Sequence, residues 1–321
     1  MKPLKLLAGI LLGAVALGFI VSIPFYAHEM AQIRKSLRAN SKTMESPYGT
    51  IEYVDIGSGT PVLVSHGTMG GYDLGLLQAQ GFTGEGHRFI IPSRFGYLRS
   101  SLPADPSFEL QADCYAYLLE QLNIDRAIVQ GMSAGGVPAL QFAIRHPDKC
   151  EGLILMSSIA YAPPADFQKQ ELPLPDSVYR ALLKSDYLFW MLLKLAPKSL
   201  QSIYGVSEEL VASSDEREVE LLEKMSHVFL PVSERYAGWE ADGEDIDSLK
   251  ELPLENITAP TLIISAKDDT IAPYVLSTYT AERIRNAQLV TLETGGHVLL
   301  GHMQEVTDIN NAFIEGCAAK K

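Results

Sequence analysis

The sequence predicts an α/β protein in which helices cover both faces of a mostly parallel sheet. Short runs of β-branched and aliphatic residues alternate with helical stretches from about residue 50 onward. Several of these runs are almost continuously apolar, which is typical of strands buried on both faces of a parallel sheet. The chain has 321 residues, of which 47% are apolar and 20% charged, so its composition is that of a globular protein.

Charge and cysteine content narrow the functional classes. The net charge of −13 argues against a nucleic-acid partner, because such proteins need a basic face. Cys114, Cys150 and Cys317 have no C-x-x-C spacing, so we expect neither a disulfide framework nor a cysteine-based zinc site. A single disulfide between two of them stays open. Nothing in the sequence indicates an oligomeric state.

The first expected element is an apolar segment at residues 6–26. It contains no charged residue, and its 21 residues would span roughly 30 Å as a helix, which matches the hydrocarbon core of a bilayer. A cleavable signal peptide usually has an apolar region of about 7–15 residues and a small-x-small site, whereas the best candidate at 25–27 begins with a large residue. We therefore expect residues 1–26 to form a membrane anchor, with a signal segment as the alternative, and residues 27–46 to form a polar stalk.

Basic residues lie on both sides of this segment. Lys2 and Lys5 favour a cytoplasmic N-terminus, whereas the basic residues between positions 34 and 42 oppose it. Because the two lysines lie closer to the apolar segment, we expect the following domain, residues 47–321, on the extracytoplasmic side.

The strands and helices of this domain follow in alternation. The expected strands are residues 51–56, 61–65, 88–91, 126–130, 152–156, 261–265 and 288–292. The expected helices are residues 108–122, 137–145, 273–285 and 303–313. Ser107 or Asp105 can cap the first of these helices, and Pro273 suits a first helical turn.

The alternation is interrupted between about residues 161 and 252. This stretch is helical in pattern and rich in aromatic residues, and it ends in an acidic segment at 240–247. An insertion of this size between two strands predicts a cap over the carboxyl end of the sheet, where ligands bind in such folds. We expect the acidic segment to be a solvated loop rather than a receptor for a cationic substrate.

A glycine-flanked serine follows the strand at 126–130. Residues 131–135 read GMSAG, which is G-x-S-x-G in the strand–turn–helix context that this motif requires. A side chain at either glycine would meet the neighbouring strand or helix. The turn projects the Ser133 hydroxyl away from the sheet, and the N-terminus of the next helix favours negative charge there. Ser133 is therefore the candidate nucleophile, with an ordinary glycine-rich turn as the alternative.

A serine nucleophile needs a base, and the base needs an orienting acid. The last two predicted strands are followed by Asp269 and by His297, respectively. Because parallel strands end at the same edge of a sheet, we expect both side chains near Ser133. Asp268 remains the alternative acid. His302, five residues beyond His297, is the less favoured base.

The loop at 66–71 reads HGTMGG and follows the second predicted strand of the domain. Acyl transfer creates a tetrahedral oxyanion that needs two preformed backbone N–H donors. We expect one from Ala134 and the other from Thr68, with Met69 as the alternative. Supporting roles in these two turns are expected for His66, Gly67, Gly131 and Gly135.

These motifs together resemble the α/β-hydrolase superfamily. The resemblance covers about residues 50–316 and rests on HGTMGG, GMSAG, AKDDTIAP and GGHVLLGH. It implies an eight-stranded, mostly parallel sheet with a helical cap after the sixth strand. It also implies a triad of Ser133, His297 and Asp269, with Thr68 and Ala134 lining an oxyanion hole.

One loop departs from the family pattern. Where many relatives carry Asp-x-x-Gly-x-Gly-x-Ser after the fourth strand, residues 93–100 read SRFGYLRS. Ser93 replaces the aspartate and Leu98 replaces the second glycine. Because this loop borders the pocket in the family, the substrates of better-known relatives do not transfer to this chain.

The predicted activity is hydrolysis of a carboxylic ester, and less readily of an amide, through an acyl-serine intermediate. The substrate is expected to be a small acyl or ester compound, and neither a metal nor an organic cofactor is implied. Acyl transfer and hydrolysis of a carbon–carbon bond on the same triad remain alternatives. A catalytically silent domain that binds or tethers a partner is the alternative outside enzymology.

Overall fold

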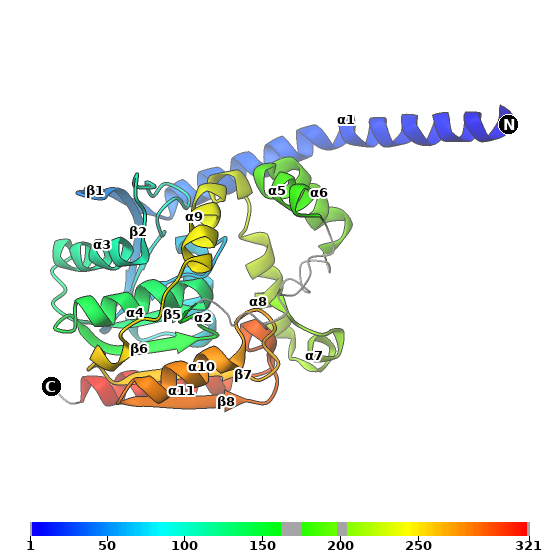
Figure 1. The fold of residues 1–321 in the computed structure, drawn as a ribbon. Helices are drawn as coiled ribbons and strands as arrows, with labels where there is room; N and C mark the ends of the chain where they lie inside the picture. The colour runs from blue at the N-terminus through cyan, green and yellow to red at the C-terminus, as the bar shows by residue number, and fades with distance from the viewer. Residues whose placement is uncertain (1, 162–174, 198–203, 320–321) are drawn as a thin grey trace.

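An eight-stranded sheet forms the centre of the computed structural model, which describes residues 2–161, 175–197 and 204–319. For residues 2–17 only the helix itself is described. The strand order is β1-β2-β4-β3-β5-β6-β7-β8, and all neighbours from β4 to β8 are parallel (Figure 1). The strands are β1 Lys42–Ser46, β2 Gly49–Gly57, β3 Thr60–Ser65, β4 His87–Pro92, β5 Ala127–Met132, β6 Cys150–Met156, β7 Thr261–Ala266 and β8 Ala287–Leu292.

Helices cover both faces of the sheet, and each face has its own apolar cluster. One cluster includes side chains of α2 and α11, and the other includes side chains of α3, α4 and α10. These helices are α2 Tyr72–Phe82, α3 Phe108–Gln121, α4 Gly136–Arg145, α10 Tyr274–Arg283 and α11 Met303–Ala318. The prediction of a mostly parallel sheet between helical layers is therefore confirmed.

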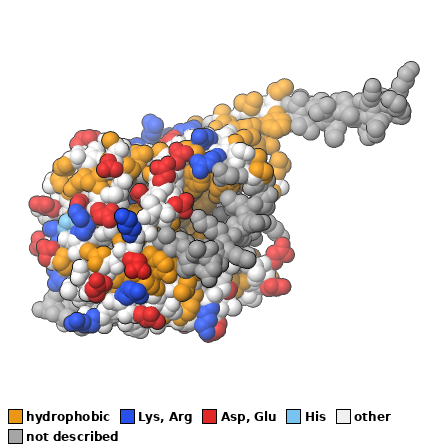
Figure 2. All heavy atoms as spheres, viewed as in Figure 1, with side chains coloured by type: hydrophobic (Ala, Val, Ile, Leu, Met, Phe, Trp, Pro, Cys, Tyr) orange, Lys and Arg blue, Asp and Glu red, His pale blue; other side chains and the backbone are white. Residues whose placement is uncertain are grey.

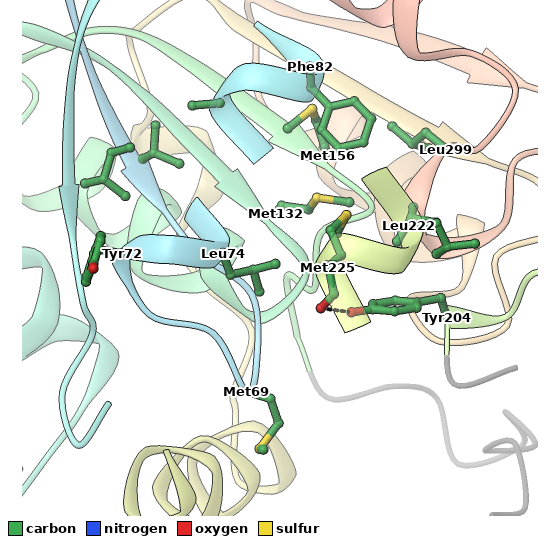
Figure 3. Packing of buried hydrophobic residues seen from close by; sticks show 14 of the residues in the cluster. Met69, Tyr72, Leu74, Phe82, Met132, Met156, Tyr204, Leu222, Met225 and Leu299 are labelled. Atoms are coloured by element: carbon green, nitrogen blue, oxygen red, sulfur yellow. Dashed lines mark hydrogen bonds between the residues drawn. The ribbon is translucent and has the colours of Figure 1, made fainter. Parts of the chain in front are cut away.

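The segment between β6 and β7 is helical where the structure describes it. Its helices are α5 Asp176–Lys184, α6 Asp186–Leu195, α7 Glu208–Ser213, α8 Glu216–His227 and α9 Tyr236–Asp247. We call these helices, with the turn η4 Val232–Glu234, the cap. Leu222 and Met225 of α8 point into the same apolar cluster as Phe82 and Met132, and the Tyr204 hydroxyl donates a hydrogen bond to the Met225 carbonyl oxygen (Figure 3). The cap thus shares its packing with the sheet.

The seven predicted strands correspond to β2 through β8, but β1 was not predicted. Residues 42–46 pair with β2 in an antiparallel register, although their side chains are largely exposed. Such a strand is held by its backbone, so its sequence carries no apolar signal. The helix α2 was also missed, because two of its eleven residues are glycines and it follows a glycine-rich loop.

The structure places residues 27–46 against the domain, which corrects the prediction of a stalk. A single helix, α1 Lys2–Ala39, leaves the body of the molecule at one end and packs on the cap at the other (Figure 1). Met30 is 1% exposed, and Ile33 and Leu37 pack on the same cluster. Their spacing of three and four residues gives an apolar stripe within a polar segment, and the helix buries that stripe.

The predicted membrane segment at 6–26 lies within α1. Within the part of the chain that the structure describes, no helix is both long enough and apolar enough to cross a bilayer. Most of the predicted segment falls at residues 2–17, whose side chains lie outside the described residues.

The buried stripe of α1 gives a first prediction. Met30→Ala should lower the free energy of unfolding by about 2–5 kcal/mol, because it leaves a cavity in a packed core. Denaturant unfolding in detergent measures the change. Phe25→Ala is the matched control on the same helix, since Phe25 is 67% exposed. Equal stability of the two variants would show that α1 does not belong to the folded domain.

Candidate active site

Ser133 lies at a strained turn between β5 and α4. Its φ angle is +55°, a conformation that side chains rarely adopt and that a surrounding structure must enforce. A Cβ on Gly131 would lie 2.7 Å from the Gly135 carbonyl oxygen, and one on Gly135 would lie 2.2 Å from that of Ser65. Both glycines are thus required by the close approach of β3, the turn and α4, as the motif predicted.

The structure brings Ser133, His297 and Asp269 together at the ends of β5, β8 and β7. The Ser133 Oγ lies 2.8 Å from His297 Nε2, and His297 Nδ1 lies 2.9 Å from one Asp269 carboxylate oxygen and 3.2 Å from the other. Asp269 is fixed in turn by the backbone N–H groups of Ile271 and Ala272 at 2.8 and 2.9 Å. His297 and Asp269 are 6% and 5% exposed, so the hydrogen bonds between them are shielded from water, whereas Ser133 is partly exposed.

The two alternative residues lie elsewhere. Asp268 accepts hydrogen bonds from the backbone N–H groups of Gly295 and Gly296 at 3.2 and 2.9 Å, and so holds the loop that carries His297. His302 lies just before α11 and contacts Glu305 at 2.9 Å, on a partly exposed surface. Neither alternative contacts Ser133 or His297 directly.

The glycine-rich loop lies beside the nucleophile. A Cβ on Gly67 would lie 3.4 Å from the Ser133 Cβ, so the backbone that follows Gly67 borders the serine. Among the described residues the backbone N–H of Thr68 has no hydrogen-bond partner, whereas the Met69 backbone interacts with the Tyr97 hydroxyl. Thr68 is therefore the better placed of the two predicted donors on this loop.

His66 supports this loop from beneath. It is fully buried; its Nδ1 lies 2.7 Å from the Gly67 carbonyl oxygen, and its Nε2 accepts the backbone N–H of Arg94 at 2.9 Å. This pattern fixes the neutral tautomer with the proton on Nδ1. Burial and the nearby Arg94 lower the pKa of His66 well below its usual value, which keeps the ring neutral.

The cap contributes a buried ion pair that the sequence analysis missed. Arg94, on the loop after β4, forms two hydrogen bonds of 2.5 Å with Asp242 of α9, and its Nε donates to the His66 carbonyl at 2.9 Å. Asp242 also accepts from the hydroxyls of Tyr97 at 2.5 Å and Thr68 at 3.2 Å. Asp242 therefore contacts the loop that carries the candidate oxyanion donor.

The acidic segment at 240–247 is the last part of α9 and not a solvated loop, which corrects the prediction. Arg235, Gly238 and Asp242 are the buried positions, and their spacing of three and then four residues marks one helix face. That spacing was the available signal. The partner of Asp242 could not be read from it, because Arg94 lies 148 residues away in the sequence.

A second ion pair, with the charges reversed, joins the residue before α9 to the start of α2. Arg235, with no exposed surface, donates to Asp73 at 2.6 Å and to the Gly70 carbonyl oxygen. Here the cap supplies the cation, whereas in the first pair it supplies the anion. Asp242 of α9 and Arg235, directly before α9, thus contact the segment from His66 to Asp73 at Thr68, Gly70 and Asp73.

A metal site is not evident in the described ranges, where no three His, Cys, Asp or Glu side chains gather as possible ligands. The three cysteines are buried, and none is in a disulfide. Burial raises the pKa of Cys150 to about 12, so this thiol is not reactive at neutral pH.

Comparison with known proteins identifies the family to which this fold belongs. A family model described as the alpha/beta hydrolase fold matches residues 60–301. The chain belongs to the α/β-hydrolase fold family. Together with the linked Ser133, His297 and Asp269, this makes it a serine hydrolase.

Relatives of this hydrolase are distant but extend over most of the chain. The "Uncharacterized hydrolase YcgS" of Bacillus subtilis is 26% identical over 274 residues, covering 82% of this chain and 93% of that protein. The 2-hydroxymuconate semialdehyde hydrolase of Pseudomonas putida is 27% identical over 251 residues, covering 76% and 82%. The solved alpha/beta hydrolase fold protein from Nakamurella multipartita is 26% identical with a TM-score of 0.69, covering 88% of this chain and 100% of that one.

The ion pair of Arg94 and Asp242 gives a prediction for a neighbouring carboxyl group. Burial and the negative charges of Asp242 and Glu109 raise the pKa of Asp245 from 3.8 to about 6. The folded state therefore holds this proton more tightly than the unfolded chain, so the ionised carboxylate destabilises the fold above about pH 6 and has no effect below about pH 4.

Asp245→Asn should accordingly be more stable than the parent at about pH 8, with the difference disappearing as the pH falls to about 4. Denaturant unfolding at several pH values measures this change. Asp125→Asn is the control, because Asp125 is an exposed aspartate outside the cap. A difference that grows toward low pH would contradict the assignment.

Proposed function

We propose that this serine hydrolase cleaves a carboxylic ester of a small molecule, and less readily an amide, through an acyl-Ser133 intermediate. The observation that carries the proposal is the chain of hydrogen bonds from Ser133 through His297 to Asp269. It lies at the carboxyl edge of the sheet, beside the N-terminus of α4 and the loop at Thr68. Nucleophile, base, orienting acid and oxyanion donors are therefore adjacent.

In the first step His297 Nε2 takes the proton of the Ser133 hydroxyl as the oxygen attacks the ester carbonyl. The carboxylate of Asp269 accepts the Nδ1–H of His297, which fixes the required tautomer and stabilises the imidazolium. The strained turn presents the hydroxyl at this position without further rearrangement.

The tetrahedral intermediate carries its negative charge on the former carbonyl oxygen. Ala134, in the 3-10 turn directly before α4, and Thr68 supply the backbone N–H groups that stabilise this charge, and the N-terminus of α4 adds to the positive field. His297 then returns its proton to the leaving alcohol. A water molecule activated by the same nitrogen releases the acid and restores Ser133.

The expected membrane attachment remains part of the proposal. Its support is the uncharged sequence at 6–26 and the exposure of the large apolar residues that the structure describes there before Tyr26. These residues are Phe19, Ile20, Val21, Ile23 and Phe25, at 42–67% exposed (Figure 2). Such a surface is unfavourable in water and favourable in lipid. We place the hydrolase domain on the extracytoplasmic side because Lys2 and Lys5 precede the segment.

A fluorophosphonate probe tests the nucleophile. The parent should gain one adduct in its intact mass, Ser133→Ala should gain none, and His297→Ala should react slowly because the hydroxyl has lost its base. Turnover of p-nitrophenyl acetate and butyrate should be lost in the same two variants. His302→Ala is the matched control and should react like the parent. A folded parent without an adduct would favour a binding module over an enzyme.

The link between Asp242 and the Thr68 loop gives a kinetic prediction. Asp242→Asn leaves Arg94 without its carboxylate and frees the loop, so kcat should fall by up to about 100-fold, as when an oxyanion donor is lost. KM for a p-nitrophenyl ester should change much less. Glu244→Gln is the control on the exposed side of the same helix. Unchanged kcat in Asp242→Asn, with the fold retained, would show that α9 does not position this loop.

A further inference from the structure

The exposed apolar side chains of this hydrolase are concentrated on one part of its surface. Eight of the eleven large apolar residues that are exposed in the described chain belong to α1, α5 and α6. Five of them are the residues of α1 named above, and the others are Val178, Leu188 and Leu195. A concentrated patch of this kind marks an interaction surface, whereas scattered apolar residues do not.

The helix α6 carries apolar side chains on two opposite sides, and Lys194 is its exposed charged residue. Phe189, Trp190 and Leu193 are buried toward the cap, but Leu188 and Leu195 on the other side are 41% and 75% exposed. All seven residues from 187 to 193 are aromatic or aliphatic. A helix that is apolar on both faces is typically buried on both. The rest of the cap covers only one face of α6.

The helix α6 also runs alongside the apolar part of α1. The hydroxyls of Tyr187 and Ser22 are 2.6 Å apart, and the Tyr187 ring packs edge-on against Tyr26 at 5.1 Å. Further along, the indole N–H of Trp190 donates to Glu29 at 3.0 Å, and Lys194 pairs with the same carboxylate at 3.0 Å. These contacts therefore fix the position of α6 along the length of α1.

This position places the start of α6 beside the part of α1 that is proposed to enter the lipid bilayer. Phe19, whose ring lies 6.0 Å from that of Tyr187, precedes Tyr26 by seven residues, or about 10 Å along a helix. A bilayer that covers residues 6–26 must therefore meet the start of α6.

We propose that α6 is an interfacial membrane helix that seats the cap in the lipid surface from which α1 emerges. The inference rests on the proposed attachment through residues 6–26. Leu188 and Leu195 enter the acyl boundary, and the aromatic cluster of Tyr26, Tyr187 and Trp190 lies at headgroup level. Lys194, which pairs with Glu29 and is 46% exposed, lies beside the lipid phosphates. A bilayer of phosphatidylcholine with anionic phosphatidylglycerol fits this chemistry.

Fluorescent probes on the full-length protein in vesicles of these two lipids test the proposed membrane contact of α6. Leu188→Cys and Leu195→Cys carry an environment-sensitive thiol dye, since the three native cysteines are buried. Leu102→Cys and Val275→Cys are the matched controls, because Leu102 and Val275 are 42% and 48% exposed elsewhere on the domain. The α6 probes should emit at shorter wavelength and lose emission when the lipids are brominated near the headgroup, and the controls should do neither.

A probe at Phe25→Cys separates failure of this inference from failure of the attachment. Quenching at Phe25 without quenching at Leu188 and Leu195 would overturn the proposed membrane contact of α6 and would leave the attachment through residues 6–26 intact. No quenching at Phe25 overturns both. An emission shift to shorter wavelength for the α6 probes without quenching would show that protein, such as a second copy of the chain, covers α6. That result would also overturn the proposed membrane contact of α6. Fluorophosphonate labelling of Ser133 in the same samples reports the hydrolase independently.

Discussion

The placement of α9 against the loop at 66–73 is the constraint on which the rest of the site depends. Arg235, directly before α9, pairs with Asp73. Asp242 of α9 pairs with Arg94 on the loop after β4, and Arg94 donates to the His66 carbonyl oxygen. Removing one partner of such a pair commonly costs about 3–5 kcal/mol, because the other charge stays buried without compensation. The cap and the core therefore hold this loop jointly, and its conformation is not a property of the sheet alone.

The same cap segment links this loop to α1. Glu234 and Arg235 are adjacent in the sequence but face in different directions. Glu234 accepts a hydrogen bond from Arg34 of α1 at 2.7 Å, whereas Arg235 reaches the glycine-rich loop. Arg34 also binds Asp186 at the start of α6, at 2.6 Å. A continuous series of charged contacts thus runs from the N-terminal helix through the cap to the loop beside Ser133.

The sequence was sufficient for features that depend on local pattern. Apolar runs predicted seven strands, and glycines around Ser133 predicted a turn whose tight contacts the structure shows. Two features were beyond it. The strand β1 is polar and is held by backbone pairing, and the partner of Asp242 is distant in the chain. Asp268 and Asp269 are adjacent aspartates, and only three-dimensional geometry shows which one meets His297.

The contacts of α1 bear on how the cap acts in catalysis. A flexible stalk would leave the cap free to move against the membrane and against the sheet. Here α6 is tied to α1 and α9 is tied to the loop of Thr68, so these two cap helices are fixed to the groups that surround them. Oxyanion stabilisation is effective when its donors are preorganised, because no reorganisation is then needed during the reaction. A cap fixed in this way acts as part of the catalytic framework. The proposed membrane contact of α6 would hold that framework at a constant height above the lipid.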